Sequence, residues 1–464
     1  MRKQRRIKLG VCPIGKFVFS HEDAIVQKAI LFRKLDELGV DYVHIDSVLP
    51  DGMVRDHAHV EPVVQFFKEQ KIDALFVPHC NFGTESAVGM IAKKLGLPTL
   101  LWGPRDDAPF EDGTRLRDSL CGMFASSKVL HKLGVKYSYI ENCTVDDAPF
   151  VQGLDKFLRA VAAAKYLKTS VIGQIGTRID FFWCTITNES ELLERFGVQI
   201  LPFDMVDYIT DIKKRTDKNR SLYKAEIRDD SFPYDISNVD EDGVIRSLAM
   251  RDVLFDYSEK HQIDAWSIQS FMSLQEALGD AVGIGEAYVQ ETIPIAAESD
   301  IHGAISSIIL EAAAKSESGP SFFPEFTIRH PENDNAVLLW HASAAASLRD
   351  PSIIKIPLAP PWILATLPTT SLQFNFKPGA LTTCRFDGDG GEYRLGIGEG
   401  RIISGPKTRE SYGWLEVVDW PSFERKLMEG PYPHHCTCIY GHMADVLEEA
   451  CRFIPGLTPE RLDK

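Results

Sequence analysis

The feature that most constrains this fold is the alternation of short apolar runs with longer amphipathic segments in the first part of the chain. Apolar runs of strand length occupy residues 6–14, 41–48, 73–80 and 98–104. The segments between them, 21–40, 60–72 and 85–97, carry apolar residues at helical spacing. Strands that alternate with helices pair in parallel, because a parallel connection needs a crossover of a dozen or more residues. The pattern therefore predicts an α/β fold built on a parallel sheet.

Two loops of this predicted sheet carry side chains suited to binding. Ligands of parallel sheets bind beyond the carboxyl ends of the strands. Two segments lie at the carboxyl ends of successive predicted strands. The first is "PHCNFGTES", with His79 and Asn81, and the second is "LLWGPRDD", with Trp102 and Arg105. Both segments are candidate functional loops, and two ordinary strand-to-helix turns are the alternative.

The chain divides into three predicted domains. The first parallel-sheet domain, Rossmann-like in pattern, covers residues 1–165, and renewed alternation predicts a second such domain over 166–312. Helical patterns then become rare, which predicts a β-rich C-terminal domain over 313–464. The pair of glycines at 173 and 176 lacks the full spacing of a dinucleotide fingerprint. The segment "DGDGGE" at 387–392 lacks the ligands of a calcium loop and predicts a tight hairpin turn.

Composition narrows the function. Of 464 residues, 44% are hydrophobic and 25% charged, as in a globular protein with an ample core. The net charge of -15 argues against nucleic-acid binding, which requires a basic face. No run reaches the roughly 18 apolar residues of a membrane span, and the basic first residues lead straight into a strand pattern, so we expect a cytoplasmic protein. Nine cysteines without framework spacing predict reduced thiols.

Two glutamates stand in unusually apolar surroundings. Glu298, in "PIAAESDIHGAISSIIL", lies between an apolar strand and an apolar helix, and Glu325 lies in "GPSFFPEFTIR" among phenylalanines. A buried carboxylate costs several kcal/mol unless it is paired, protonated or bound to a metal. Outward-facing residues on half-buried strands are the alternative. Metal binding becomes attractive because histidines are available: His435 in "YPHHCTCIYGH" and, less directly, His341 in "LLWHAS".

These residues resemble a known family, the L-fucose isomerase and L-arabinose isomerase superfamily of metal-dependent aldose–ketose isomerases. The segments "AESDIHG" and "FFPEFT" are similar to those that carry the two metal-binding carboxylates, and "HHCTCIYGH" is similar to the segment with the metal-binding histidine. The resemblance spans the whole chain and implies two Rossmann-like domains followed by a β-rich domain that completes the metal site. A structural zinc site is the alternative for "HHCTC", but the two cysteines lack a second half.

The resemblance implies Glu298, Glu325 and His435 as metal ligands, with the two glutamates as general acid and general base. Two carboxylates and one imidazole suit Mn²⁺, with Mg²⁺ or Co²⁺ possible. The expected reaction converts an open-chain aldose into a ketose through a cis-enediol. Which glutamate is the base is left open.

Further residues are implied as substrate contacts. Gln269 resembles a substrate-contacting glutamine, with a solvent-facing strand residue as the alternative. His434 stands where fucose isomerases carry asparagine, and His341 resembles an additional ligand of arabinose isomerases, with an ordinary histidine as the alternative. Trp102 and Arg105 are expected to reach a neighbouring subunit's site in a homo-oligomer, a trimer or hexamer, with active sites near subunit interfaces. The planar fork of Arg105 also suits an anionic group on the sugar.

The substrate and two other functions stay open. The sugars in question are L-fucose, D-arabinose, L-arabinose and a 6-substituted anionic hexose such as sulfoquinovose. A non-catalytic sugar-binding or regulatory protein on the same fold is the alternative from another class. A metal-dependent aldolase or epimerase would use similar ligands.

Overall fold

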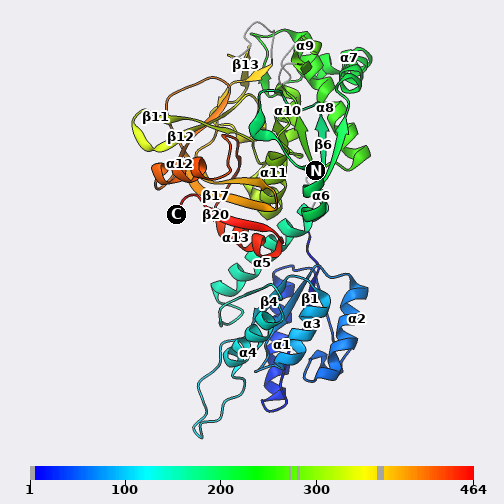
Figure 1. Ribbon diagram of the computed structural model, residues 1–464, viewed down its shortest axis with the longest axis vertical. Helices are drawn as coiled ribbons and strands as arrows, with labels where there is room; N and C mark the ends of the chain where they lie inside the picture. Colours follow the sequence, from blue (N-terminus) through cyan, green and yellow to red (C-terminus); the bar gives the residue numbers. More distant parts are fainter. Residues whose placement is uncertain (1–5, 271–272, 280–282, 363–369) are drawn as a thin grey trace. The chain divides into compact units, whose positions relative to one another are not determined.

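The computed structural model describes residues 6–270, 273–279, 283–362 and 370–464. Internal contacts divide the chain into two compact units, one that ends at Lys165 and one that spans Tyr166–Lys464. Helix α5 (Ala148–Lys168) runs across this division (Figure 1). The predicted fold class, parallel α/β sheets followed by a β-rich region, is confirmed.

The first unit is a five-stranded parallel sheet in the order β2-β1-β3-β4-β5. Its strands are β1 (Leu9–Val11), β2 (Tyr42–His44), β3 (Ala74–Pro78), β4 (Thr99–Trp102) and β5 (Tyr137–Tyr139). Its helices, besides α5, are α1 (His21–Glu37), α2 (Val60–Gln70), α3 (Glu85–Leu95) and α4 (Ser119–Lys132), with short 3-10 turns η1 (Pro50–Gly52) and η2 (His57–His59). Every residue of β3 is buried, as expected for the central strand of a sheet covered on both faces.

The second unit begins with a four-stranded parallel sheet in the order β10-β9-β6-β7. Its strands are β6 (Val171–Ile175), β7 (Gln199–Phe203), β9 (Ala265–Ile268) and β10 (Ile295–Ala297). The helices of this part are α6 (Glu189–Phe196), α7 (Met205–Arg228), α8 (Glu241–His261), α9 (Ser273–Leu278), α10 (Gly283–Gln290) and α11 (Ile301–Ala313), with the 3-10 turn η3 (Trp183–Thr185). A small sheet, β14-β13-β8, joins β8 (Tyr234–Asp235), β13 (Ile356–Ala359) and β14 (Ser371–Leu372).

An eight-stranded, mostly antiparallel sheet completes the second unit, with the order β11-β12-β18-β17-β16-β19 along its main path. The strands are β11 (Glu325–His330), β12 (Asn333–His341), β15 (Phe374–Asn375), β16 (Gly379–Asp389), β17 (Glu392–Ile403), β18 (Ser411–Glu416), β19 (Thr437–Tyr440) and β20 (Leu457–Arg461). Helices α12 (Trp420–Glu429) and α13 (Ala444–Phe453) and the turns η4 (Ser316–Ser318) and η5 (Ala346–Leu348) connect them. The predicted hairpin at 387–392 is confirmed: Asp389 pairs with Glu392, and Gly390 and Gly391 adopt positive φ between them.

Helix α11 ties the two kinds of sheet together. It packs against β6, β9 and β10 of the parallel sheet and against β16 and β19 of the antiparallel one, and Figure 1 shows it between the green and the orange strands. Nearly all of its side chains are buried, which matches the predominance of apolar and small residues in the helix. Residues 166–464 form one compact unit, and α11 contacts both of its large sheets.

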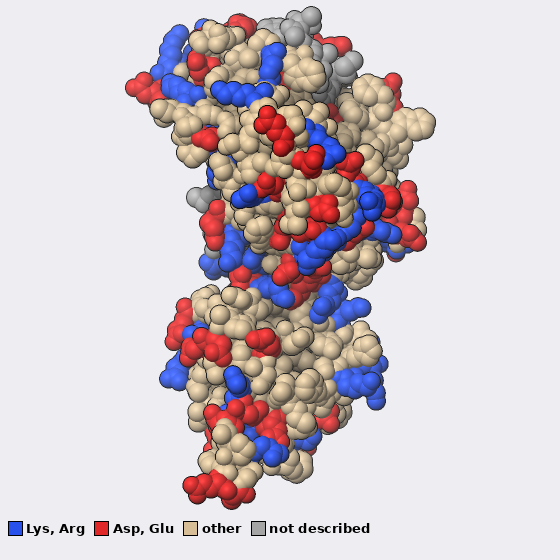
Figure 2. Space-filling model, turned by 90° about the vertical axis from the view of Figure 1, so that its left-hand side faces the viewer, with Lys and Arg blue, Asp and Glu red and all other residues tan. Residues whose placement is uncertain are grey.

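The surface is mixed in charge. On the face shown in Figure 2, acidic and basic side chains are interspersed over both units. Within the described parts of the chain, none of the helices combines the length and the apolar character that crossing a membrane requires.

Candidate metal centre

The carboxyl edge of the second parallel sheet supplies one side of the candidate metal centre. Glu298 directly follows β10, and Gln269 directly follows β9. Glu298 and Ser299 have φ of 62° and 56°, a left-handed conformation that costs about 1–2 kcal/mol per non-glycine residue. Two hydrogen bonds hold this turn: Ser299 donates its N–H to Ile268 O at 3.1 Å and its hydroxyl to Thr177 O at 3.1 Å. Strained backbone of this kind clusters at functional sites.

The antiparallel sheet supplies the other side. Glu325 is the first residue of β11 and forms an isolated antiparallel bridge with His435, which lies just before β19. Backbone hydrogen bonds fix the two segments together, since Phe326 donates to His434 O at 2.9 Å and Cys436 donates to Pro324 O at 3.0 Å. This local pairing places two residues that are far apart in the sequence side by side.

The four side chains of Glu298, Glu325, His434 and His435 converge. Each offers one ligand atom, and these atoms all lie within 4.8 Å of one another. His435 Nε2 is 2.9 Å from a carboxylate oxygen of Glu298 and 3.8 Å from one of Glu325. His434 Nε2 is also 3.8 Å from Glu325. The structure thus brings together the three expected ligands and adds His434, which we had expected only as a substrate contact.

The donor set fits a divalent cation. Glu298 Oε2 and His435 Nε2 are fully buried and, although close, make no hydrogen bond of good geometry with any described residue. A buried polar atom without a partner costs about 1–3 kcal/mol, more if it is charged. A cation between these atoms and Glu325 would satisfy both. Oxygen and imidazole nitrogen are donors that Mn²⁺ accepts, and neither Cys436 nor Cys438 belongs to the cluster.

The electrostatics of the cluster also favour a cation. Burial alone would lower the pKa of His435, but its contacts with Asp300, Glu298 and Glu325 raise that pKa well above its ordinary value. Burial alone would raise the pKa of Glu325, but His435 and His341 lower it. Burial and the neighbouring His435 lower the pKa of His434. The negative field that favours a proton on His435 Nε2 attracts a divalent cation at the same place.

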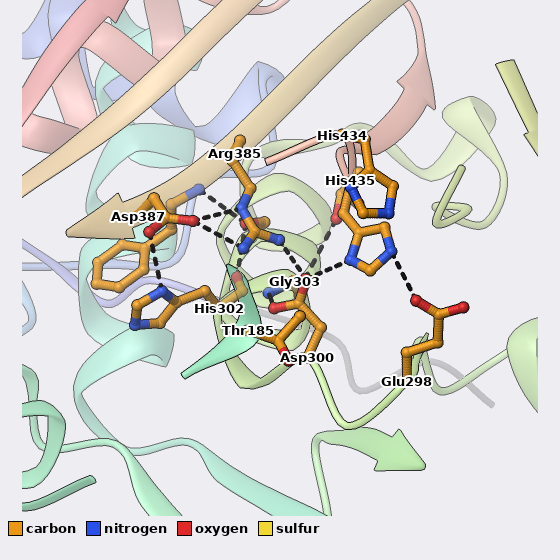
Figure 3. A network of polar contacts seen from close by, with 12 residues as sticks. Thr185, Glu298, Asp300, His302, Gly303, Arg385, Asp387, His434 and His435 are labelled. Carbon is orange, nitrogen blue, oxygen red and sulfur yellow. Dashed lines mark hydrogen bonds and ion pairs between the residues drawn. The ribbon is translucent and has the colours of Figure 1, made fainter. Parts of the chain in front are cut away.

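Behind His435 lies a buried ionic chain that we did not predict (Figure 3). His435 Nδ1 is 2.8 Å from Asp300 Oδ2, and Arg385 Nη1 donates to the same oxygen at 2.6 Å. Arg385 also donates to Asp387 Oδ2 from Nε at 2.9 Å and from Nη2 at 2.7 Å. His302 Nδ1 is 3.3 Å from the other Asp387 oxygen. Asp300 and Arg385 are 0% and 2% exposed, so the chain is screened from water.

The sequence gives only a weak signal for this network of buried ionic contacts. Asp300 precedes an apolar helix and is its N-cap, which accepts from Gly303 N at 2.8 Å. That reading accounts for the aspartate without any reference to His435. Arg385 and Asp387 sit at alternate positions of β16 and therefore point to one face. The pattern suits an exposed face equally well, so the sequence hides their burial.

Two further expected residues lie in the second unit. His341 ends β12 with its side chain 6% exposed and its Nε2 without a described hydrogen-bond partner, and its ring centroid is 5.8 Å from that of Phe323. Phe323 in turn packs on His435 at 4.9 Å. Gln269 is half-buried, and its backbone N–H donates to Ile175 O at 2.9 Å.

An aromatic loop borders the histidines. Phe182 belongs to the segment that follows β6, and its ring stacks on His434 with centroids 6.4 Å apart. It is also 6.3 Å from His435. The neighbouring Phe181 and Trp183 are 65% and 74% exposed. Such large exposed aromatic side chains beside a polar centre are typical of binding surfaces.

The remaining expected residues belong to the first unit. Trp102 is 1% exposed and packs edge-on against Phe150 at 4.9 Å. Arg105, by contrast, is exposed. His79 is fully buried and its Nδ1 contacts Phe82 O at 2.9 Å, while Asn81 accepts from Lys16 N at 2.8 Å. His79 and Asn81 follow β3, Trp102 is the last residue of β4, and Arg105 follows that strand.

Comparisons with known proteins place the chain among sugar isomerases. Residues 10–168 match a family model described as the N-terminal domain of fucose/sulfoquinovose isomerase, and residues 367–455 match one described as the C-terminal domain of L-fucose isomerase. A protein of Alkalicoccus urumqiensis named sulfoquinovose isomerase is 25% identical over 81% of this chain and 83% of its own length. Proteins of Priestia aryabhattai and Priestia megaterium with the same name are each 22% identical over 95% of this chain and 96% of their own length.

Proposed function

Because this chain belongs to the fucose isomerase-like family and is an aldose–ketose isomerase, we propose that it acts on the open-chain form of its sugar at a divalent cation held by Glu298, Glu325 and His435. The observation that carries this proposal is the convergence of four ligand atoms, two of which, Glu298 Oε2 and His435 Nε2, are fully buried and lie 2.9 Å apart without a well-formed hydrogen bond. Ordinary core packing would leave no such set, since buried polar groups are normally hydrogen-bonded. We propose Mn²⁺ as the cation, with Mg²⁺ or Co²⁺ as substitutes.

The bound cation would orient the C1 and C2 oxygens of the sugar and stabilise negative charge on them. The residues of the chain carry the protons. One of the carboxylates, Glu298 or Glu325, removes the proton from C2, and a hydrogen moves from the C2 oxygen to the C1 oxygen to leave a cis-enediolate with its negative charge on the C2 oxygen. The other carboxyl returns a proton to C1, which yields the ketose with no net change in atoms. The two groups flank the same His435 Nε2 atom at 2.9 and 3.8 Å, so both face one substrate position.

His434 and Gln269 are proposed as contacts to sugar hydroxyls. His434 is 39% exposed at its side chain, and its lowered pKa keeps it neutral, so it can donate or accept a hydrogen bond. Gln269 shares the carboxyl edge of the sheet with Glu298. The stacked ring of Phe182 would shield this position from bulk water, which strengthens the polar contacts inside.

We propose sulfoquinovose, an aldose with a sulfonate at C6, as the substrate. The support is the name of the relatives that match most of the chain. A sulfonate needs a cationic partner, and the exposed guanidinium of Arg105 offers one. We further propose a homo-oligomer, a trimer or hexamer, in which Arg105 of one subunit serves the centre of the next.

The test combines metal content with proton exchange in D₂O. Wild type, Glu325→Gln and the matched control Glu332→Gln, which changes an exposed glutamate on the turn after β11, would be expressed with Mn²⁺. We expect about one Mn²⁺ per chain and deuterium at C1 of the ketose for wild type and control. We expect Glu325→Gln to lose exchange by roughly 10²–10⁴-fold, the usual contribution of an acid–base group.

The sugar panel decides the substrate. It contains sulfoquinovose, L-fucose, L-arabinose and D-arabinose, with kcat/KM measured for each. Turnover of a neutral sugar above sulfoquinovose would refute the sulfonate proposal and leave the metal centre standing. A wild-type protein that binds no divalent cation, or binds one without exchange on any sugar, would refute the mechanism and favour a sugar-binding role.

A further inference from the structure

The contacts of Asp300 determine the protonation of His435. Asp300 is 0% exposed, and both of its oxygens face donors: Oδ1 accepts from Gly303 N at 2.8 Å, and Oδ2 accepts from Arg385 Nη1 at 2.6 Å. A carboxylate held in this way is only an acceptor. The 2.8 Å contact from His435 Nδ1 to the same Oδ2 therefore requires a hydrogen on Nδ1. The lone pair of the neutral imidazole is then on Nε2, the atom that faces Glu298 and Glu325.

The other members of the buried ionic network, Arg385 and Asp387, hold Asp300 in place. Three guanidinium nitrogens of Arg385 are used, one on Asp300 and two on Asp387, so the guanidinium cannot rotate without breaking charge-assisted bonds. Asp387 is anchored in turn by Gly388 N at 2.8 Å and by His302. Figure 3 shows the result: His435 lies between Asp300 on one side and Glu298 on the other, with Arg385 behind Asp300.

Stability alone does not explain this arrangement. Buried ion pairs are often no more stabilising than well-packed apolar residues of similar volume, because the desolvation of the charges offsets their attraction. A carboxylate on the distal nitrogen of a ligand histidine, however, fixes its tautomer and ring orientation and typically changes metal affinity by 10–100-fold.

We infer that Asp300 is a positioning residue for the metal centre: it accepts the Nδ1 hydrogen of His435 and so presents Nε2 to the cation, while Arg385 and Asp387 hold Asp300 in place. The inference rests on the proposed function, because it assumes that His435 is a ligand. It assigns Asp300 no contact with the sugar, so its first effect is on metal binding rather than on the proton transfers.

The test is the Mn²⁺ dissociation constant of metal-free protein, measured by electron paramagnetic resonance of the free ion, with thermal unfolding recorded in parallel. In Asp300→Asn the amide oxygen can still cap Gly303 N, but its NH₂ group faces Nδ1 and forces the hydrogen of His435 onto Nε2. We expect the affinity to fall about 10–100-fold. Asp252→Asn is the matched control, since it removes a carboxylate that pairs with an arginine, Arg251, at 2.8 Å and belongs to no part of the His435 contacts; we expect its affinity to stay within about twofold of wild type.

The outcomes separate the two proposals. Failure of wild type to bind Mn²⁺ would overturn the metal centre itself. Equal affinity of wild type and Asp300→Asn, or equal losses in both variants, would overturn the positioning role alone. If Asp300→Asn does not fold, the ¹⁵N spectrum of histidine-labelled wild type decides, with His435 assigned by its loss in His435→Gln. The spectrum is recorded with diamagnetic Mg²⁺ in place of paramagnetic Mn²⁺: a hydrogen on Nδ1 in the Mg²⁺-loaded protein supports the inference, and one on Nε2 refutes it.

Discussion

Replacement of Arg385 by methionine tests how much the buried contacts of Arg385 with Asp300 and Asp387 contribute to the free energy of unfolding. Arg385 is 2% exposed and is the cation shared by Asp300 and Asp387. Methionine has a similar length but no charge, so both carboxylates would lose their shared cation while still buried. Breaking a buried pair by removing one partner costs about 3–5 kcal/mol. We expect Arg385→Met to lose at least this much free energy of unfolding at pH 7, since two partners are stranded.

The pH dependence of that loss has a definite sign. Burial alone would raise the pKa of Asp300 and of Asp387, but Arg385 holds both well below their ordinary range. Depressed carboxyl pKa values contribute stability that is present above the unfolded pKa near 4 and disappears as the pH falls below it. In Arg385→Met desolvation raises the two pKa values, so the variant takes up protons on folding and gains stability as the pH falls from 7 to 5. The difference from wild type should therefore shrink over this range.

The assay is urea unfolding of metal-free protein at pH 7 and pH 5, followed by circular dichroism at one protein concentration. Arg394→Met, on the exposed edge contact with Glu460, is the control for loss of an arginine and should change stability by less than about 1 kcal/mol. A loss below about 1 kcal/mol for Arg385→Met, or a loss that does not change with pH, would contradict the reasoning. It would mean that water or a rearranged side chain replaces the guanidinium.

Two further predictions concern packing and titration. A Cβ on Gly303 would lie 2.3 Å from Phe323 Cε2, so Gly303→Ala should lower the free energy of unfolding, measured in urea, by about 1–3 kcal/mol. It should also weaken Mn²⁺ binding, because Phe323 packs on His435. Unchanged stability would show that the Phe323 ring moves freely. Burial lowers the pKa of His79 to about 4. Below pH 6.5 the unfolded chain therefore binds more protons than the folded protein, and the free energy of unfolding decreases as the pH falls. The free energy of unfolding of wild type should decrease by roughly 2 kcal/mol more than that of His79→Gln between pH 7.5 and pH 5. An equal pH dependence of the free energy of unfolding in the two proteins would contradict this.

Local patterns predicted much of the architecture because strands and helices bury periodic faces. The alternation over the first part of the chain predicted the parallel sheet, and the glycines at 390 and 391 predicted the hairpin between β16 and β17. The sequence did not predict that α11 contacts both sheets, because an apolar helix is compatible with one neighbouring sheet or with two. Trp102 was expected at a ligand, yet an aromatic residue at the end of an apolar strand fits the core equally well.

In the candidate site, too, some residues could be predicted from the sequence and others could not. Glu298 and Glu325 stand out in the sequence because a carboxylate in apolar surroundings needs compensation. Asp300 does not, because its role as a helix N-cap already accounts for it. Its contact with His435 joins residues 135 positions apart, and such a contact leaves no local pattern.

By itself, therefore, the sequence determined the periodic elements, the acidic charge of the chain and the residues whose burial would be costly, since each of these depends on neighbours within a few positions. The tertiary structure alone decided that the carboxyl edge of one sheet meets the start of another at His435, and that Arg385 and Asp387 stand behind Asp300. These are long-range arrangements, set by how α11 packs between two sheets, and the chemistry of the centre depends on them.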